Sequence, residues 1–88
     1  MPYHVPDRLL LQAVADEKVI LDPDSGTYYT LDAVGARMID LLRETGSIEQ
    51  AVAGIVAEYE VDELTALDHL TELLEQMAQH GLVQKTGG

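Results

Sequence analysis

The sequence predicts an α+β fold in which a three-stranded antiparallel sheet is followed by three helices. Three observations lead to this prediction: short stretches rich in Leu, Val and Ile occupy the first third of the chain, apolar residues then recur at helical spacing, and helix-capping residues stand at the boundaries of the periodic segments. Sheet-forming and helix-forming segments are thus segregated along the chain, which is typical of the α+β class.

The first two strands are expected to form a hairpin. Residues 8–14 (RLLLQAV) and 17–21 (EKVIL) are short and rich in aliphatic residues. Ala15 and Asp16 interrupt the strand pattern between the two segments. These two segments are therefore predicted to pair with each other in antiparallel fashion.

A turn and a third strand follow the hairpin. In the sequence DPDSG at 22–26, Pro23 presets φ for a turn and Gly26 tolerates positive φ. Residues 27–31 (TYYTL) then form the predicted third strand. Two short connections in succession make a meander with the second strand in the centre, so the third strand is an edge with one side open.

The first two helices are indicated by their caps. Asp32 is expected to cap a helix over residues 33–44 that Gly46 ends, and Ser47 followed by Gln50 is a capping-box pattern that begins the second helix. Both segments carry apolar residues at helical spacing, namely Val34, Met38, Ile39, Leu41 and Leu42, then Ile48, Val52, Ile55, Val56 and Tyr59.

The third and longest helix is predicted over residues 63–80, after Asp62, with Gly81 at its C′ position and residues 82–84 (LVQ) as a closing segment. Its apolar residues cover about half of the helix circumference, wider than the ~100° stripe that one core contact requires. They are Leu64, Leu67, Leu70, Leu73, Leu74 and Met77. Part of this arc either faces a partner or is wedged between the sheet and the other helices.

Composition limits the class of protein. Eighty-eight residues suit one domain over residues 1–88, with an aliphatic core drawn from thirteen Leu, eight Val and four Ile, because Trp and Phe are absent. Without cysteine there is no disulfide or thiolate metal site, which fits the reducing cytoplasm. No run reaches the roughly 18 apolar residues of a membrane span, and the first residues lack the pattern of a signal peptide.

The formal net charge of −11 disfavours nucleic acid and anionic lipid as partners and favours a basic or neutral one. Three helices after a sheet also suggest a winged helix-turn-helix arrangement. Its third helix would normally present basic residues to DNA, yet residues 63–80 contain no Lys or Arg. That helix carries Glu63, Asp68, Glu72 and Glu75 instead, so DNA binding is not expected.

No catalytic or metal-binding constellation stands out. Asp22 and Asp24 imitate the start of a calcium loop, but Gly26 falls one place early and the twelfth position is Ala33 instead of Glu. The three histidines are His4, His69 and His80, of which the last two lie roughly 16 Å apart along one helix. We expect no metal, no cofactor and no enzymatic activity.

An acyl or peptidyl carrier protein is the alternative interpretation of a small acidic chain. It needs a serine for a phosphopantetheine arm at a helix start, typically within Asp-Ser-Leu. Ser25 follows Asp24 but precedes Gly26 in a predicted turn, and Ser47 starts a helix but follows Gly46. Neither serine matches the carrier pattern fully.

The whole pattern resembles the PqqD-like family of recognition domains for ribosomally made, modified peptides. The resemblance rests on VILDPDSGTYYTLDAVGARMIDLL (19–42), GSIEQAVAGIVAEYEVD (46–62) and a long helix ending HGLV (80–83), and it covers residues 8–84. Within the family, the short acidic stand-alone form is most similar to the proteins of lasso-peptide clusters. There the domain holds the leader of a precursor peptide for a separate leader protease of the cysteine-protease class and a separate ATP-dependent macrolactam synthetase.

The resemblance also implies how the leader binds: as a fourth strand beside the third strand, over the third helix, by β-augmentation. The residues then expected to contact it are Thr27, Tyr28, Tyr29, Thr30 and Leu31 on the strand, with Leu67, Asp68, Leu70, Thr71, Leu74 and Glu75 on the helix. Two questions stay open from sequence. The leucines are either a pocket or ordinary core, and the backbone groups that face the leader belong either to Thr27, Tyr29 and Leu31 or to Tyr28 and Thr30.

Overall fold

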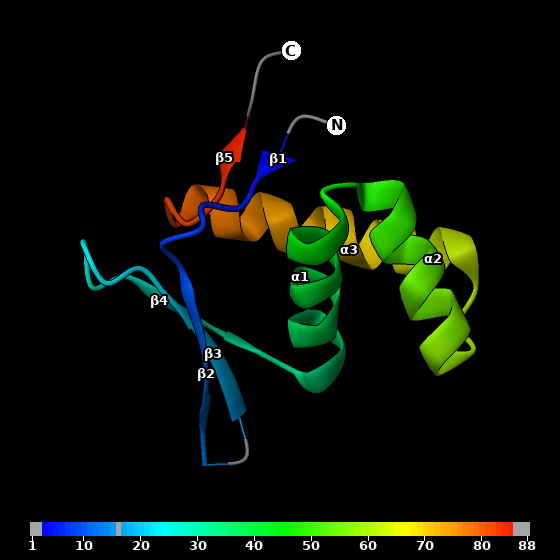
Figure 1. Cartoon of the computed structure of the whole chain (residues 1–88), viewed down its shortest axis with the longest axis horizontal. Helices are drawn as coiled ribbons and strands as arrows, with labels where there is room; N and C mark the ends of the chain where they lie inside the picture. Colours follow the sequence, from blue (N-terminus) through cyan, green and yellow to red (C-terminus); the bar gives the residue numbers. More distant parts are fainter. Residues whose placement is uncertain (1–2, 16, 86–88) are drawn as a thin grey trace.

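The computed structural model describes residues 3–15 and 17–85, with the exception of the Lys85 side chain. Asp16, half of the predicted break between the first two strands, lies outside the described residues. The elements are β1 (Tyr3–His4), β2 (Leu10–Val14), β3 (Glu17–Leu21), β4 (Tyr28–Leu31), α1 (Ala33–Thr45), α2 (Ile48–Tyr59), α3 (Glu63–Gln79) and β5 (Gln84–Lys85). The predicted α+β class is confirmed: a three-stranded antiparallel sheet precedes three helices (Figure 1).

The larger sheet is the predicted meander, with strand order β2-β3-β4. Leu21 pairs with Leu10 on one side and with Tyr28 on the other, so β3 is central. The turn between β3 and β4 is held by Asp22, whose carboxylate accepts hydrogen bonds from Arg8 at 3.4 and 3.3 Å and from the Asp24 amide at 2.9 Å. Gly26 follows with φ 76°, the positive value for which glycine is suited.

The helices begin and end through local contacts. Asp32 caps α1 by accepting from the Gly35 amide at 2.7 Å, and Ser47 caps α2 by accepting from the Gln50 amide at 3.3 Å. The Ser47 amide donates to the Thr45 hydroxyl at 3.3 Å, so the last residue of α1 supplies a hydrogen-bond acceptor at the start of α2. α1 extends one residue beyond its predicted end, to Thr45.

α3 is one residue shorter than predicted. Its N-cap Asp62 accepts from two backbone amides, and the helix ends at Gln79 with His80 as C-cap. Gly81 has φ 76°, its amide donates to Ala78 O at 3.0 Å, and the amide of Leu82 donates to Met77 O at 2.9 Å. This is a Schellman motif, which turns the chain back over the helix.

The helices pack on one side of the β2-β3-β4 sheet, and the core lies between them (Figure 1). Ile20 and Leu31 point inward from the sheet at 0% and 3% exposed. Most of the wide apolar arc of α3 belongs to this core, because Leu70, Leu73, Leu74 and Met77 are all buried. Leu64, in contrast, is 69% exposed.

A second, two-stranded sheet joins the ends of the chain. β1 pairs antiparallel with β5, with Tyr3 opposite Lys85 and His4 opposite Gln84. The predicted closing segment is therefore partly a strand, and its first two residues, Leu82 and Val83, are buried. The β1 strand was not predicted, because two residues carry no recognisable strand pattern.

None of the helices formed by residues 3–15 and 17–85 combines the length and the hydropathy that a membrane span needs.

Candidate functional site

The outer edge of β4 is free within the part of the chain that the structure describes, because β4 pairs only with β3. The Asp22 amide donates to Thr27 O at 2.8 Å, which identifies Asp22 and Thr27 as a hydrogen-bonded pair of the antiparallel ladder. Hydrogen-bonded and non-hydrogen-bonded pairs alternate along such a ladder. With the observed register, the main-chain groups of Tyr29 therefore face β3, and those of Tyr28 and Thr30 face outward.

A groove runs beside this edge. It has a volume of about 250 Å³ and lies between β4, the start of α1 and one face of α3. Its walls are formed by Tyr29, Thr30, Leu31, Asp32, Gly35, His69, Glu72, Leu73 and Gln76. Gly35 leaves the space open, since a Cβ there would lie 3.0 Å from the Asp32 Oδ1 atom and 3.5 Å from the Leu73 Cδ2 atom.

α3 presents a single face to the groove. His69, Glu72, Leu73 and Gln76 follow the i, i+3, i+4, i+7 spacing that places residues on one side of a helix. At one end the Tyr29 hydroxyl donates to Gln76 Oε1, and the Tyr29 ring meets the His80 ring edge-on at 5.3 Å between centroids. These contacts fix the β4 edge relative to α3.

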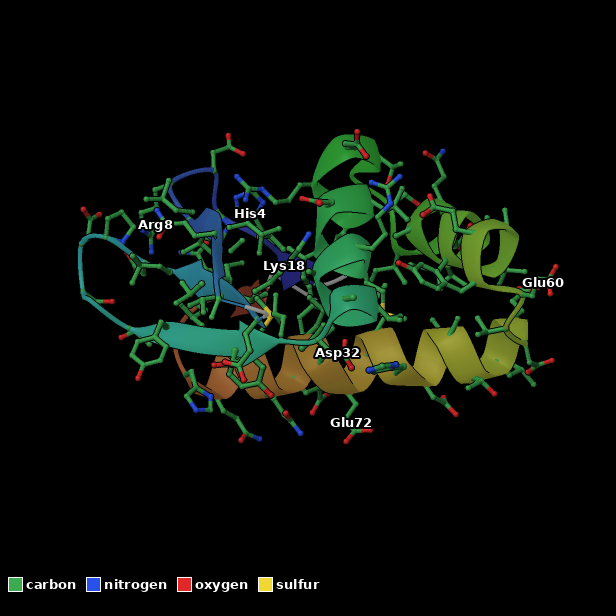
Figure 2. The ribbon with its side chains drawn as sticks, turned by 90° about the horizontal axis from the view of Figure 1, so that it is seen from below. His4, Arg8, Lys18, Asp32, Glu60 and Glu72 are labelled. Carbon is green, nitrogen blue, oxygen red and sulfur yellow. The ribbon has the colours of Figure 1, made fainter. Side chains whose placement is uncertain are left out.

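The groove is acidic. Asp32 stands where β4 leads into α1, and Glu72 projects from the neighbouring stretch of α3 (Figure 2). The Asp32 carboxylate caps α1 by accepting the Gly35 amide. Glu72, in contrast, forms no hydrogen bond or ion pair with any of residues 3–15 and 17–85. No Lys or Arg is among the residues that line the groove.

The structure brings part of the predicted site together. Tyr29, Thr30 and Leu31 line the groove as expected for the strand. Thr27, predicted as the first residue of the strand, is half-buried and immediately precedes β4. Tyr28 is 64% exposed on the opposite face of the sheet.

The predicted helix residues do not line the groove. Leu70 and Leu74 are 0% exposed and belong to the core, and neither is among the residues that line the groove. Leu67 is half-buried against the core. The groove instead uses the face of α3 adjacent to its core-facing leucines.

The polar residues predicted on α3 are also directed elsewhere. Thr71 is half-buried and Asp68 is exposed, and neither lines the groove. Glu75 accepts a hydrogen bond from the Tyr3 hydroxyl at 2.9 Å, on the side of the helix that meets β1. Desolvation and the Glu75 carboxylate raise the pKa of Tyr3 above its ordinary value.

The groove residues that sequence reasoning missed are Asp32, Gly35, His69, Glu72, Leu73 and Gln76. The available signal was the series at 69, 72, 73 and 76, which runs beside the core series along α3. That signal is weak, because spacing places residues on a common face without saying what the face meets.

A second surface lies on the face of the sheet turned away from the helices. Leu10, Val14 and Tyr28 are 43%, 56% and 64% exposed there, and Val19 and Leu21 between them are half-buried. Leu10 and Tyr28 both pair with Leu21, so these three side chains form an apolar row across the strands. We call this row, together with Val14 and Val19, the outer sheet face. Exposed apolar surfaces of this kind are typical of protein contacts.

Asp22 and the two serines considered for a carrier arm have local roles in the fold. No group of three or more His, Cys, Asp or Glu side chains there is arranged to hold a metal ion. Ser25 and Ser47 each accept a local backbone hydrogen bond, from Thr27 and Gln50 respectively, and so serve the turn and the α2 cap.

Comparison with known proteins identifies the family to which the chain belongs. Residues 17–83 match the family described as Coenzyme PQQ synthesis protein D (PqqD), and the chain belongs to this family. A solved structure described as "TbiB1 in Complex with the TbiA(beta) Leader Peptide" is 36% identical, with a TM-score of 0.77 over 96% of this chain and 98% of that one.

A second structure, "Lasso peptide synthetase B1 complexed with the leader peptide", has a TM-score of 0.76 over 94% of this chain and 98% of that one. At 20% identity it supports the fold alone. No curated protein matches the sequence.

Proposed function

We propose that this protein is a non-catalytic adaptor that binds the leader segment of a ribosomally synthesised precursor peptide of the lasso type. The leader adds to the sheet as a fourth strand beside β4, over α3. The adaptor then presents the precursor to a separate leader protease and to a separate ATP-dependent macrolactam synthetase. We place this activity in the cytoplasm, where the ribosome makes the precursor.

The observation that carries the proposal is the free edge of β4 beside the groove on α3. Tyr28 and Thr30 turn their backbone donors and acceptors outward, which is the arrangement that an added strand requires. Family membership supports it further, since TbiB1, at 36% identity, is described in complex with a leader peptide.

Magnitudes indicate that the edge and the groove act together. The two outward residues offer four backbone groups, and at a net ~1 kcal/mol each they supply about half of the ~8 kcal/mol that micromolar affinity represents. Ordering a flexible leader also costs free energy. Side-chain contacts in the groove must therefore contribute the remainder.

The outer sheet face gives the partner enzymes a place to dock that the leader does not occupy. The leader lies beside β4 in the plane of the sheet, whereas Leu10 and Val14 lie on the strand farthest from that edge. A partner on this face can act on a precursor that the adaptor still holds.

Titration of labelled synthetic peptides tests the proposal. The leader should bind alone and should confer its affinity on an unrelated peptide to which it is joined, while the segment that becomes the mature product should bind far more weakly. Equal affinity of the mature segment and of the full precursor would contradict leader recognition.

A further inference from the structure

Strand addition at β4 determines which leader side chains enter the groove. In antiparallel or parallel pairing, residues opposite each other direct their side chains to the same face of the sheet. Tyr29 and Leu31 point toward the helices. Leader side chains level with these two residues, two positions apart, therefore point toward α3, and the one nearer Leu31 lies toward Asp32 and Glu72.

This part of the groove is amphipathic in a particular way. Leu31 and Leu73 form an apolar floor that is only 3% and 8% exposed, and the carboxylates of Asp32 and Glu72 stand at the rim. A purely apolar side chain would fill the floor but would leave both carboxylates beside a dry surface. A long cationic side chain packs its methylene stem on the floor and carries its charged end to the rim.

The two carboxylates are not equivalent. Asp32 already accepts the Gly35 amide at the N-terminus of α1, where the helix dipole favours a negative charge. Glu72 has no hydrogen-bond or ion-pair partner among residues 3–15 and 17–85, and its helix bears no Lys or Arg. Glu72 is therefore the carboxylate that gains most from a cation brought by the leader.

We propose that the groove selects a leader with a Lys or Arg at the position whose side chain enters between Leu31 and α3, and that Glu72 is the residue that reads this charge, assisted by Asp32. The inference rests on the proposed function, because it requires a strand beside β4. It names a specificity determinant distinct from Asp68 and Glu75, which lie off the groove.

The test uses a displayed library of random peptides selected on the wild-type protein. Peptides that bind at the β4 edge are those that lose affinity for a Thr30→Pro variant. Among them, we expect Lys or Arg at one position, two residues from an apolar one. Replacing that Lys by Met keeps the stem and removes the charge, and should weaken binding about five- to tenfold.

The protein variants form a double-mutant cycle with the Lys→Met peptides. Glu72→Gln should lose most of this affinity for the Lys peptide and bind the Met peptide as the wild type does. Asp32→Asn keeps a good N-cap and should show a smaller loss of the same kind. Asp68→Asn, an equal charge change elsewhere on α3, is the matched control and should bind like the wild type.

The outcomes separate the two proposals. The proposed recognition of a cation by Glu72 would be overturned if peptides that bind at the β4 edge lacked a preferred Lys or Arg, or if Lys showed no coupling with Glu72. Strand addition at β4 would be unaffected by either result. If selection yields only peptides whose affinity is unchanged by Thr30→Pro, both strand addition and the recognition of a cation by Glu72 are refuted. Thermal melts of each variant establish that a lost affinity is not a lost fold.

Discussion

Substituting proline for Thr30 tests the assignment of backbone groups along β4. The Thr30 amide faces outward, so proline removes one of the four groups offered to the leader and leaves the pairing with β3 intact. The loss of one bond at ~1 kcal/mol corresponds to about a fivefold weaker Kd. The pyrrolidine ring also stands where the incoming strand must approach, so the measured loss should be at least that large.

Tyr29→Pro is the matched comparison on the neighbouring residue. Its amide faces β3, so the substitution leaves an inward acceptor without a donor and should lower the free energy of unfolding by about 1–3 kcal/mol. For a chain of this size each kcal/mol shifts Tm by about 4–8 °C. Thr30→Pro, in contrast, should keep most of the wild-type Tm.

Fluorescence anisotropy with a labelled leader gives the Kd, and circular dichroism gives the melting transition. We predict that Thr30→Pro weakens leader binding with little loss of stability and that Tyr29→Pro lowers stability. A folded Thr30→Pro variant with unchanged leader affinity would refute it, because no backbone pairing at that position could then contribute.

Three further predictions concern the rest of the molecule. The Arg8 side chain holds the pKa of Asp22 below its ordinary value. The ionised Asp22 carboxylate therefore stabilises the fold above about pH 4, and this stabilisation is lost as pH falls through the lower folded pKa. Asp22→Asn should unfold at a lower urea concentration than the wild type at neutral pH, and the difference between the two should shrink in acid. Val14→Lys on the outer sheet face should leave leader affinity unchanged and slow leader removal by the protease, and equal rates would argue against docking there. The pure protein incubated with precursor and ATP should leave the mass of the precursor unchanged, and a cleaved or dehydrated product would show that the domain is itself an enzyme.

The features that the sequence predicted well are those decided by near neighbours. Asp32 and Ser47 were identified as caps because a cap needs only an acceptor side chain two or three residues before a free amide. The turn at Asp22 and the open edge of β4 followed from short connections in the same way.

The features that the sequence did not predict depend on packing between distant elements. Leu70 and Leu74 share an apolar arc with Leu73, yet the first two are entirely core and Leu73 also reaches the groove, because β4 crosses α3 at that side. Pairing of β1 with β5 joins segments from the two ends of the chain, and neither segment has a pattern of its own. Family resemblance suggested the leader as ligand, and only the packed structure showed which face of α3 lines the groove beside β4.

Amide hydrogen exchange measured by NMR, without and with saturating leader, tests strand addition at β4 most directly. In the free protein the amide of Tyr29 should exchange slowly, because it faces β3, and those of Tyr28 and Thr30 should exchange quickly. Leader binding should slow exchange at Tyr28 and Thr30 and change Tyr29 little. Fast exchange at Tyr28 and Thr30 in the saturated complex would contradict the account, because the leader would then be bound without pairing to this edge.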